Sequence, residues 1–123
     1  MPYKDKEKQR AAWNAYYDRN KDRLREDRAA RRDEAKLRNK QFVLDYLLTH
    51  PCVDCDEADP VVLEFDHLGD KEVDISALLS NGSSLSRIKK EIAKCEVVCA
   101  NCHRRRTAKR GNHFRFASMA SIG

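Results

Sequence analysis

The sequence predicts an α+β fold, in which a small mixed domain follows a long charged helix. Three observations in this chain of 123 residues favour that fold. Helix-forming residues without glycine or proline fill residues 4–40. Two Cys-x-x-Cys pairs lie at residues 52–55 and 99–102, and a β-prone segment follows the first pair. A chain of this length is expected to form one small domain with an extension.

Charge divides the chain into three parts. Residues 1–40 carry a net charge of +6, residues 41–103 carry −7, and residues 104–123 carry +6. An acidic centre suits a cation site, whereas basic ends suit a polyanion such as a nucleic acid. Charged helices that only face solvent have the same composition, so the charge pattern leaves both interpretations open.

From the pattern of apolar residues, we expect neither a membrane-spanning segment nor a signal peptide. No apolar run is long enough to cross a bilayer, and the opening residues 1–5 have no apolar core. We therefore expect no membrane partner and a reducing, cytoplasmic environment. There, paired cysteines favour metal binding over disulfide bonds.

Residues 4–40 are expected to form the long helix. Its apolar stripe is thin and sustains no heptads, being limited to Trp13, Tyr16, Tyr17 and Leu24. The helix is either a solvent-exposed element that frays at its start or a basic arm that lies along a phosphate backbone. We place the domain boundaries so that 1–40 is a basic helical extension, 41–112 the main domain and 113–123 a C-terminal tail.

The main domain begins with an amphipathic helix that ends before Pro51. Its apolar positions are Phe42, Val43, Tyr46 and Leu47. Residues 61–65 are β-prone and predict a strand that ends at Asp66 and His67. Residues 75–79 predict one helical turn, 81–84 a turn, and 85–92 a second amphipathic helix.

The last elements surround the second cysteine pair. Residues 96–98 predict a short strand that leads into it, and a helix is expected from Ala100 to a C-cap at Gly111. Little pattern follows Asn112. Phe114 and Phe116 therefore either dock on the domain or belong to a disordered tail.

The two cysteine pairs are candidate ligands of one structural zinc ion: Cys52, Cys55, Cys99 and Cys102. Each Cys-x-x-Cys turn places two sulfurs on one side of a tight loop, and two such turns complete a tetrahedron. The ion tolerates their long separation because it holds the ends of the intervening loop together. Four reduced core cysteines, or a redox pair, are the other interpretations. Cys95, the fifth cysteine, is expected to be a small core residue.

Asp66, His67 and His103 have no role in the zinc site and suit a second, hydrolytic metal ion. At the end of a strand, we expect the chain to present Asp66 and His67 to one side. Successive helix residues point about 100° apart, so Cys102 can face the zinc while His103 faces Asp66. Glu64 lies two residues before Asp66, so it either supports the metal ligands from the same face of the strand or is a solvated strand residue, and we favour the second interpretation.

The order of strand, strand and helix, with Asp-His on the first strand and Cys-x-x-Cys-His opening the helix, resembles the HNH nucleases of the ββα-metal class. Two segments carry the resemblance, LEFDH at 63–67 and CEVVCANCHRRRT at 95–107. Cys52 and Cys55 match the zinc-stapled branch of that family. The resemblance covers roughly residues 50–110 and implies a ββα-metal HNH nuclease domain with a structural zinc site of four cysteines.

Carried over by resemblance, His67 would be the general base that takes a proton from water. Asp66 and His103 would bind one divalent ion, Mg²⁺ or another metal, and DNA cleavage would leave 5′-phosphate and 3′-hydroxyl ends. Many family members carry a middle asparagine before the third cysteine, where this chain reads Lys94-Cys95. Asn101 is the nearby candidate, and it either orients His67 or is a turn residue of the cysteine pair.

A basic cluster in the last predicted helix is the candidate DNA-binding surface: Arg104, Arg105, Arg106, Lys109 and Arg110. Such a cluster would bind phosphates and fix register without reading base sequence. A solvated helix end whose cations complement the helix dipole is the alternative.

The sequence thus predicts a metal-dependent DNA endonuclease with structural Zn²⁺ and a catalytic divalent ion. Two alternatives remain open. One is a non-catalytic, zinc-stapled nucleic-acid-binding module, and the other is a nuclease subunit that is active only in a larger assembly, such as a phage packaging complex. A homodimer is a further candidate partner, because one nuclease centre cuts both strands only as a dimer or in two sequential events. Short HNH proteins of this kind resemble phage-encoded ones, so we expect the cytoplasm of a bacterium or of a phage-infected host cell.

Overall fold

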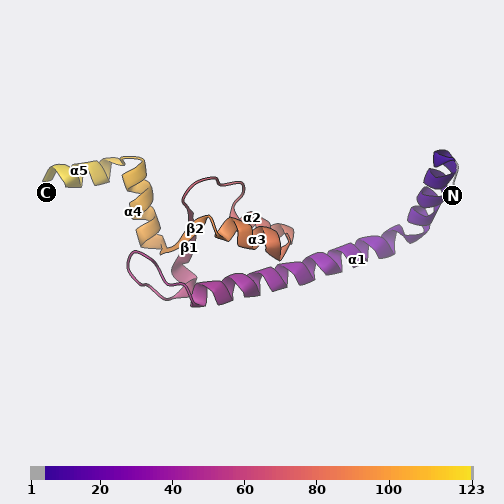
Figure 1. Ribbon diagram of the computed structural model, residues 1–123, viewed down its shortest axis with the longest axis horizontal. Coiled ribbons are helices and arrows are strands. Elements are labelled where there is room, and N and C mark those ends of the chain that lie inside the picture. Colours follow the sequence, from indigo (N-terminus) through magenta and orange to yellow (C-terminus); the bar gives the residue numbers. More distant parts are fainter. Residues whose placement is uncertain (1–4, 123) are drawn as a thin grey trace. The chain divides into compact units, whose positions relative to one another are not determined.

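The chain is a mixed α/β protein with a long N-terminal helix and a two-stranded antiparallel sheet. The computed structural model describes residues 5–122, so the outermost residues of the predicted extension and tail, 1–4 and 123, lie outside the described part. Figure 1 shows the elements in chain order: α1 (Lys6–Leu48), the 3-10 helix η1 (Pro60–Val62), β1 (Leu63–His67), α2 (Ile75–Asn81), α3 (Leu85–Ile92), β2 (Cys95–Cys99), α4 (Ala100–Arg110) and α5 (Phe114–Ile122).

The residues divide into two compact units, one that ends at Glu34 and one that begins at Ala35. The first unit consists of the N-terminal part of α1, and none of its described residues is buried. The Trp13 ring lies 5.8 Å from the Tyr16 ring and 6.4 Å from the Tyr17 ring, which leaves Trp13 56% exposed. This part of the chain is helical and exposed, as both interpretations of its composition expect.

In the second unit, the sheet separates two sets of side chains. β1 pairs with β2 so that Leu63 lies opposite Cys99 and His67 lies opposite Cys95. Leu63 and Phe65 project from one face, where Phe65 contacts Tyr46 of α1. The core on this side includes Val43, Leu47, Ile75, Leu78, Ile88, Ile92 and Val97. Glu64 and Asp66 project from the other face, toward α4.

Several predicted elements differ in extent. The first strand begins at Leu63, because residues 60–62 form η1, in which the Asp59 carboxylate accepts a hydrogen bond from the Val61 amide at 2.9 Å. α2 has 7 residues, and Gly82 caps its C-terminus in the left-handed conformation that glycine favours, with φ 65°. The residues after Asn112 form α5. The predictions of α3, β2 and α4 are confirmed.

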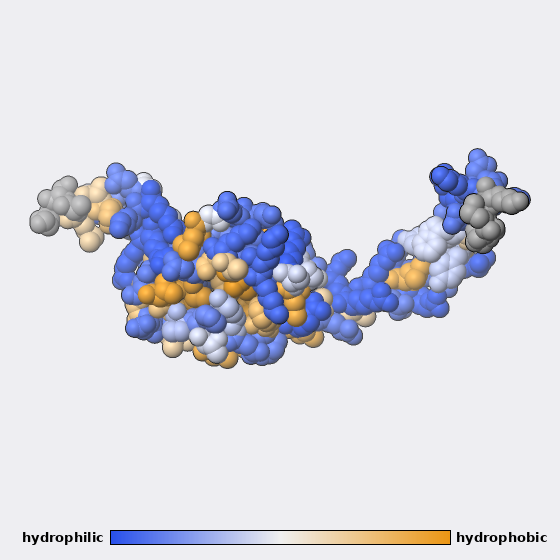
Figure 2. Space-filling model, in the orientation of Figure 1, coloured by the Kyte–Doolittle hydropathy of each residue, from blue (hydrophilic) through white to orange (hydrophobic). Residues whose placement is uncertain are grey.

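Hydrophilic residues dominate the surface visible in Figure 2, and hydrophobic residues emerge between them in several places. Among the residues whose exposure the structure describes, the most exposed large apolar side chain is that of Val61, at 88%. Within residues 5–122, none of the helices combines the length and the apolar character that a membrane crossing requires.

Candidate metal centres and catalytic site

The four cysteines of the predicted zinc site lie together. Their Sγ atoms are all within 4.8 Å of one another, and those of Cys55 and Cys99 are 3.6 Å apart. Sulfurs bound to zinc at about 2.3 Å in a tetrahedron are about 3.8 Å apart, so this donor set fits the ion. The cysteines are therefore close enough to hold a metal ion such as zinc. Cys95 lies outside the cluster, and its thiol contacts the Glu91 backbone oxygen at 3.5 Å.

Backbone hydrogen bonds position both cysteine pairs. The Val53 amide donates to the Val97 carbonyl at 3.0 Å, which attaches the first turn to β2. Cys99 is the N-cap of α4, and its Sγ accepts a hydrogen bond from the Cys102 amide at 3.4 Å. The second pair is thus presented by the strand-to-helix junction that the sequence predicts.

The thiols differ in how readily they ionise. Burial acts to raise the pKa of Cys52, but hydrogen bonds from backbone amides, including that of Cys99, outweigh burial and lower the pKa to about 6. Burial and the neighbouring thiols raise the pKa of Cys102 to about 12. A bound cation would stabilise all four as thiolates, because metal binding releases the thiol protons.

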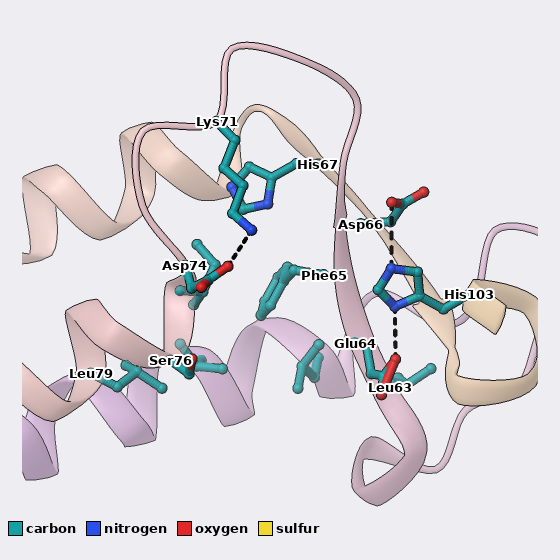
Figure 3. Close-up of a pocket in the computed structure, with 13 residues that line it drawn as sticks. Leu63, Glu64, Phe65, Asp66, His67, Lys71, Asp74, Ser76, Leu79 and His103 are labelled. Atoms are coloured by element: carbon teal, nitrogen blue, oxygen red, sulfur yellow. Dashed lines mark hydrogen bonds and ion pairs between the residues drawn. The ribbon is translucent and has the colours of Figure 1, made fainter. Parts of the chain in front are cut away.

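The second predicted site brings Asp66 and His103 together. Asp66 Oδ1 lies 3.5 Å from His103 Nε2, and His103 Nδ1 lies 2.8 Å from Glu64 Oε2. Figure 3 shows the His103 ring between the two carboxylates. Our interpretation of Glu64 as a merely solvated residue is wrong, because residues 64 and 66 project from the same face of β1 toward α4.

Two arginines of α4 hold the carboxylate of Asp66, which is only 3% exposed. Arg110 donates to Oδ1 at 2.8 Å and to Oδ2 at 2.6 Å, and Arg106 donates to Oδ2 at 2.9 Å. The hydrogen bonds from Arg110 and then Arg106 outweigh burial and lower the pKa of Asp66 to about 2. A divalent ion at this carboxylate would compete with the arginines for its oxygens.

His67 projects from the face of β1 opposite to that of Asp66, as Figure 3 shows. The expectation that Asp66 and His67 face one side is wrong. His67 still pairs with Cys95 in the ladder, so the alternation of the strand continues to its last residue. Asp66, His67 and His103 nevertheless line one cavity of about 640 Å³.

Glu91 of α3 is a candidate functional residue that the sequence reasoning missed. It is 2% exposed, and its Oε1 lies 3.0 Å from His67 Nε2. Burial acts to raise its pKa, but hydrogen bonds, first from Lys94 and then from the Glu72 amide and His67, lower it to about 2. The available signal was its position beside Ile88 and Ile92, because a charged residue on the apolar face of a short helix breaks the amphipathic pattern.

The five basic residues of α4 divide into two sets. Arg106 and Arg110 are held by carboxylates, and Arg106 also pairs with Asp54 at 2.7 Å and with Glu96 at 3.2 Å. The other three are exposed and line a groove of about 1030 Å³: Arg104, Arg105 and Lys109. Asn101 is exposed in the first turn of α4 and lines the same groove. Among the described residues, His67 is hydrogen-bonded to Glu91 and not to Asn101.

Comparison of the chain with protein-family models, with curated proteins and with solved structures finds no match. The likeness to HNH nucleases therefore rests on the motifs at 63–67 and 95–107 and on the cysteine pairs, and membership of that family stays a prediction.

Proposed function

We propose that the chain is an HNH-type endonuclease that uses a divalent metal ion to hydrolyse phosphodiester bonds of DNA. The observation that carries this proposal is the 3.5 Å approach of Asp66 Oδ1 to His103 Nε2, with His67 next to Asp66 in the chain. β1, β2 and α4 keep the strand, strand and helix order of a ββα-metal domain, with α2 and α3 inserted between the strands, and this order supports the same proposal.

The donor atoms suit a divalent ion. A carboxylate oxygen is a hard ligand for Mg²⁺, and an imidazole nitrogen suits several other divalent metals. Mg²⁺ ligands at about 2.1 Å and at right angles are about 3.0 Å apart, so a small approach of Asp66 and His103 completes the pair. When bound, the ion would stabilise charge on the scissile phosphate and on the leaving 3′ oxygen.

The protein side chains bind the phosphates and accept the proton of the attacking water. Arg110 leaves Asp66 Oδ1, and its guanidinium is then available to a phosphate group. Asp66 and His67 leave β1 on opposite faces, but both line the cavity of about 640 Å³, where a bound phosphate would lie between them. His67 takes the proton of the attacking water, since an imidazole exchanges protons near neutral pH. Arg104, Arg105 and Lys109 hold the neighbouring phosphates.

The test is nicking of supercoiled plasmid by the purified protein with Mg²⁺ and other divalent metals. His67→Ala is expected to abolish nicking while zinc content and DNA binding stay unchanged. His50→Ala is the matched control, because His50 is exposed and, among the described residues, hydrogen-bonds only to groups of its own helix end, Tyr46 and Thr49. If wild type and His67→Ala are equally inert with every metal, on both DNA and RNA, the nuclease proposal is wrong.

A non-catalytic, zinc-stapled nucleic-acid-binding module is the second candidate. The observation that favours it is that arginines hydrogen-bond both Asp66 oxygens. In that function the ion pairs are permanent, and DNA binding is independent of Mg²⁺ and leads to no cleavage. Nicking that appears only after a partner is added would instead favour the predicted subunit of a larger assembly.

A further inference from the structure

Glu91 is a buried carboxylate on the apolar face of α3, and both of its oxygens have hydrogen-bond partners. Oε1 accepts hydrogen bonds from the Glu72 amide at 3.1 Å and lies 3.0 Å from His67 Nε2. Oε2 accepts from Lys94 Nζ at 3.1 Å. Lys94 Nζ also donates to the Asp70 carbonyl at 2.9 Å. Glu91 therefore connects α3, the loop before α2 and the last residue of β1.

The charge of Glu91 determines which nitrogen of His67 carries the proton. Two of the groups around the carboxylate, the ammonium of Lys94 and the amide of Glu72, are donors and favour its ionised form. An ionised carboxylate only accepts hydrogen bonds, so His67 Nε2 must be the donor. The neutral ring then has its lone pair on Nδ1, and within residues 5–122 no group hydrogen-bonds that nitrogen.

We infer that Glu91 is a positioning residue of the proposed nuclease, which fixes the ring and the tautomer of His67 so that Nδ1 is the nitrogen that accepts the proton from water. This inference rests on the proposed function, because it assigns a further role at the same site. It accounts for the absence of an asparagine before the third cysteine, since Glu91 orients the histidine from α3. A buried carboxylate behind a catalytic imidazole holds both the orientation and the tautomer of the ring.

The same contacts also hold the loop at residues 70–72, so the test must separate positioning from loop stability. Two variants of Glu91 form a graded series, since Glu91→Gln keeps an acceptor for His67 and Glu91→Met removes it at similar volume. Lys94→Met is the matched control, because it removes another hydrogen bond from the same carboxylate and leaves the contact with His67.

Two measurements are made on the full chain loaded with zinc. In long-range ¹H–¹⁵N spectra without Mg²⁺, wild type and Lys94→Met are expected to show only the Nε2–H tautomer of His67, whereas Glu91→Met shows both tautomers. In plasmid nicking with Mg²⁺, kcat is expected to fall about 10- to 100-fold in Glu91→Met, with KM unchanged, and less in Glu91→Gln. Lys94→Met is expected to lower kcat much less than Glu91→Met, because the Glu72 amide still donates to the carboxylate.

The outcomes distinguish the inference from the function on which it rests. A wild type that nicks no substrate overturns the proposed function and the inference with it. A wild type that nicks, beside a folded Glu91→Met that nicks equally fast, overturns the inference alone. If Glu91→Met does not fold, the wild-type spectrum alone tests the inference. A neutral His67 with its proton on Nδ1 would overturn it, because the proposed contact with Glu91 requires the proton on Nε2.

Discussion

Arg110, in the last turn of α4, holds both oxygens of the buried Asp66 carboxylate near the end of β1. The two hydrogen bonds, at 2.8 and 2.6 Å, form the bidentate pair that a guanidinium makes with a carboxylate. The Arg110 side chain is 50% exposed although its partner is buried. A cation that solvent can reach therefore occupies the oxygens that a divalent ion would need.

Replacement of Arg110 is expected to strengthen Mg²⁺ binding. Arg110→Met removes the competing cation, so the Mg²⁺ concentration for half-maximal nicking should fall about two- to fivefold, the range expected for a half-exposed ion pair. The measurement is the initial nicking rate against Mg²⁺ at constant ionic strength. Lys109→Met removes a neighbouring positive charge that does not contact Asp66, and it controls for weaker DNA binding. An unchanged Mg²⁺ dependence in Arg110→Met would show that the two cations do not compete.

The Asp66 ion pairs also predict how stability depends on pH. The pKa of Asp66 falls from the ordinary 3.8 to about 2 in the folded state, so the ionised carboxylate favours folding. This contribution is present above about pH 4 and is lost as the pH falls toward 2, through the folded-state pKa. Asp66→Asn should therefore lower the free energy of unfolding by roughly 1–2 kcal/mol at neutral pH and by much less near pH 2.

Urea denaturation of wild type and Asp66→Asn at a series of pH values measures that difference. Acid also releases zinc from both proteins, so the difference between them, rather than either curve, is the relevant quantity. A difference that stays constant from pH 7 to pH 2 would contradict the proposed contribution of the ionised carboxylate.

The elements that the sequence predicts well are those defined by local rules. Each Cys-x-x-Cys pair is set by its own turn, and the chemistry of zinc requires the two pairs to meet, so the cluster follows from spacing. The helix from Ala100 follows in the same way from the cysteine pair before it and the glycine after it. η1 was missed because the Asp59 cap competes with the β-propensity of Val61 and Val62.

The partners of the site residues depend instead on which elements pack on each face of the sheet. His67 meets Glu91, and Asp66 meets Arg110, because α3 and α4 lie on opposite faces of β1. Whether the last residue of a strand still follows the alternation depends on its pairing with another strand, which its own sequence does not reveal. The face of His67 and the role of Glu64 were mispredicted for this reason.

Loss of one cysteine of the cluster is expected to remove the metal and destabilise the domain. Cys55 is exposed, so Cys55→Ser loses little buried apolar surface, and its main effect is on metal binding. We expect zinc content to fall and the melting temperature to drop sharply, as measured by elemental analysis and thermal melting. Cys95→Ser is the control because Cys95 lies outside the cluster. Wild type that contains no metal and melts unchanged with a chelator would refute the zinc site.

The two sets of basic residues on α4 should affect DNA binding differently. Lys109→Ala removes an exposed cation of the groove, so the slope of log K against log salt concentration should become less steep by about one. Arg106→Gln should leave that slope unchanged, because Asp54, Asp66 and Glu96 already pair with the guanidinium and raise its pKa further. Fluorescence anisotropy of labelled duplex DNA over a range of salt concentrations gives both slopes. Equal losses of slope would mean that Arg106 leaves its carboxylates to bind phosphate, and that α4 contacts DNA with both sets.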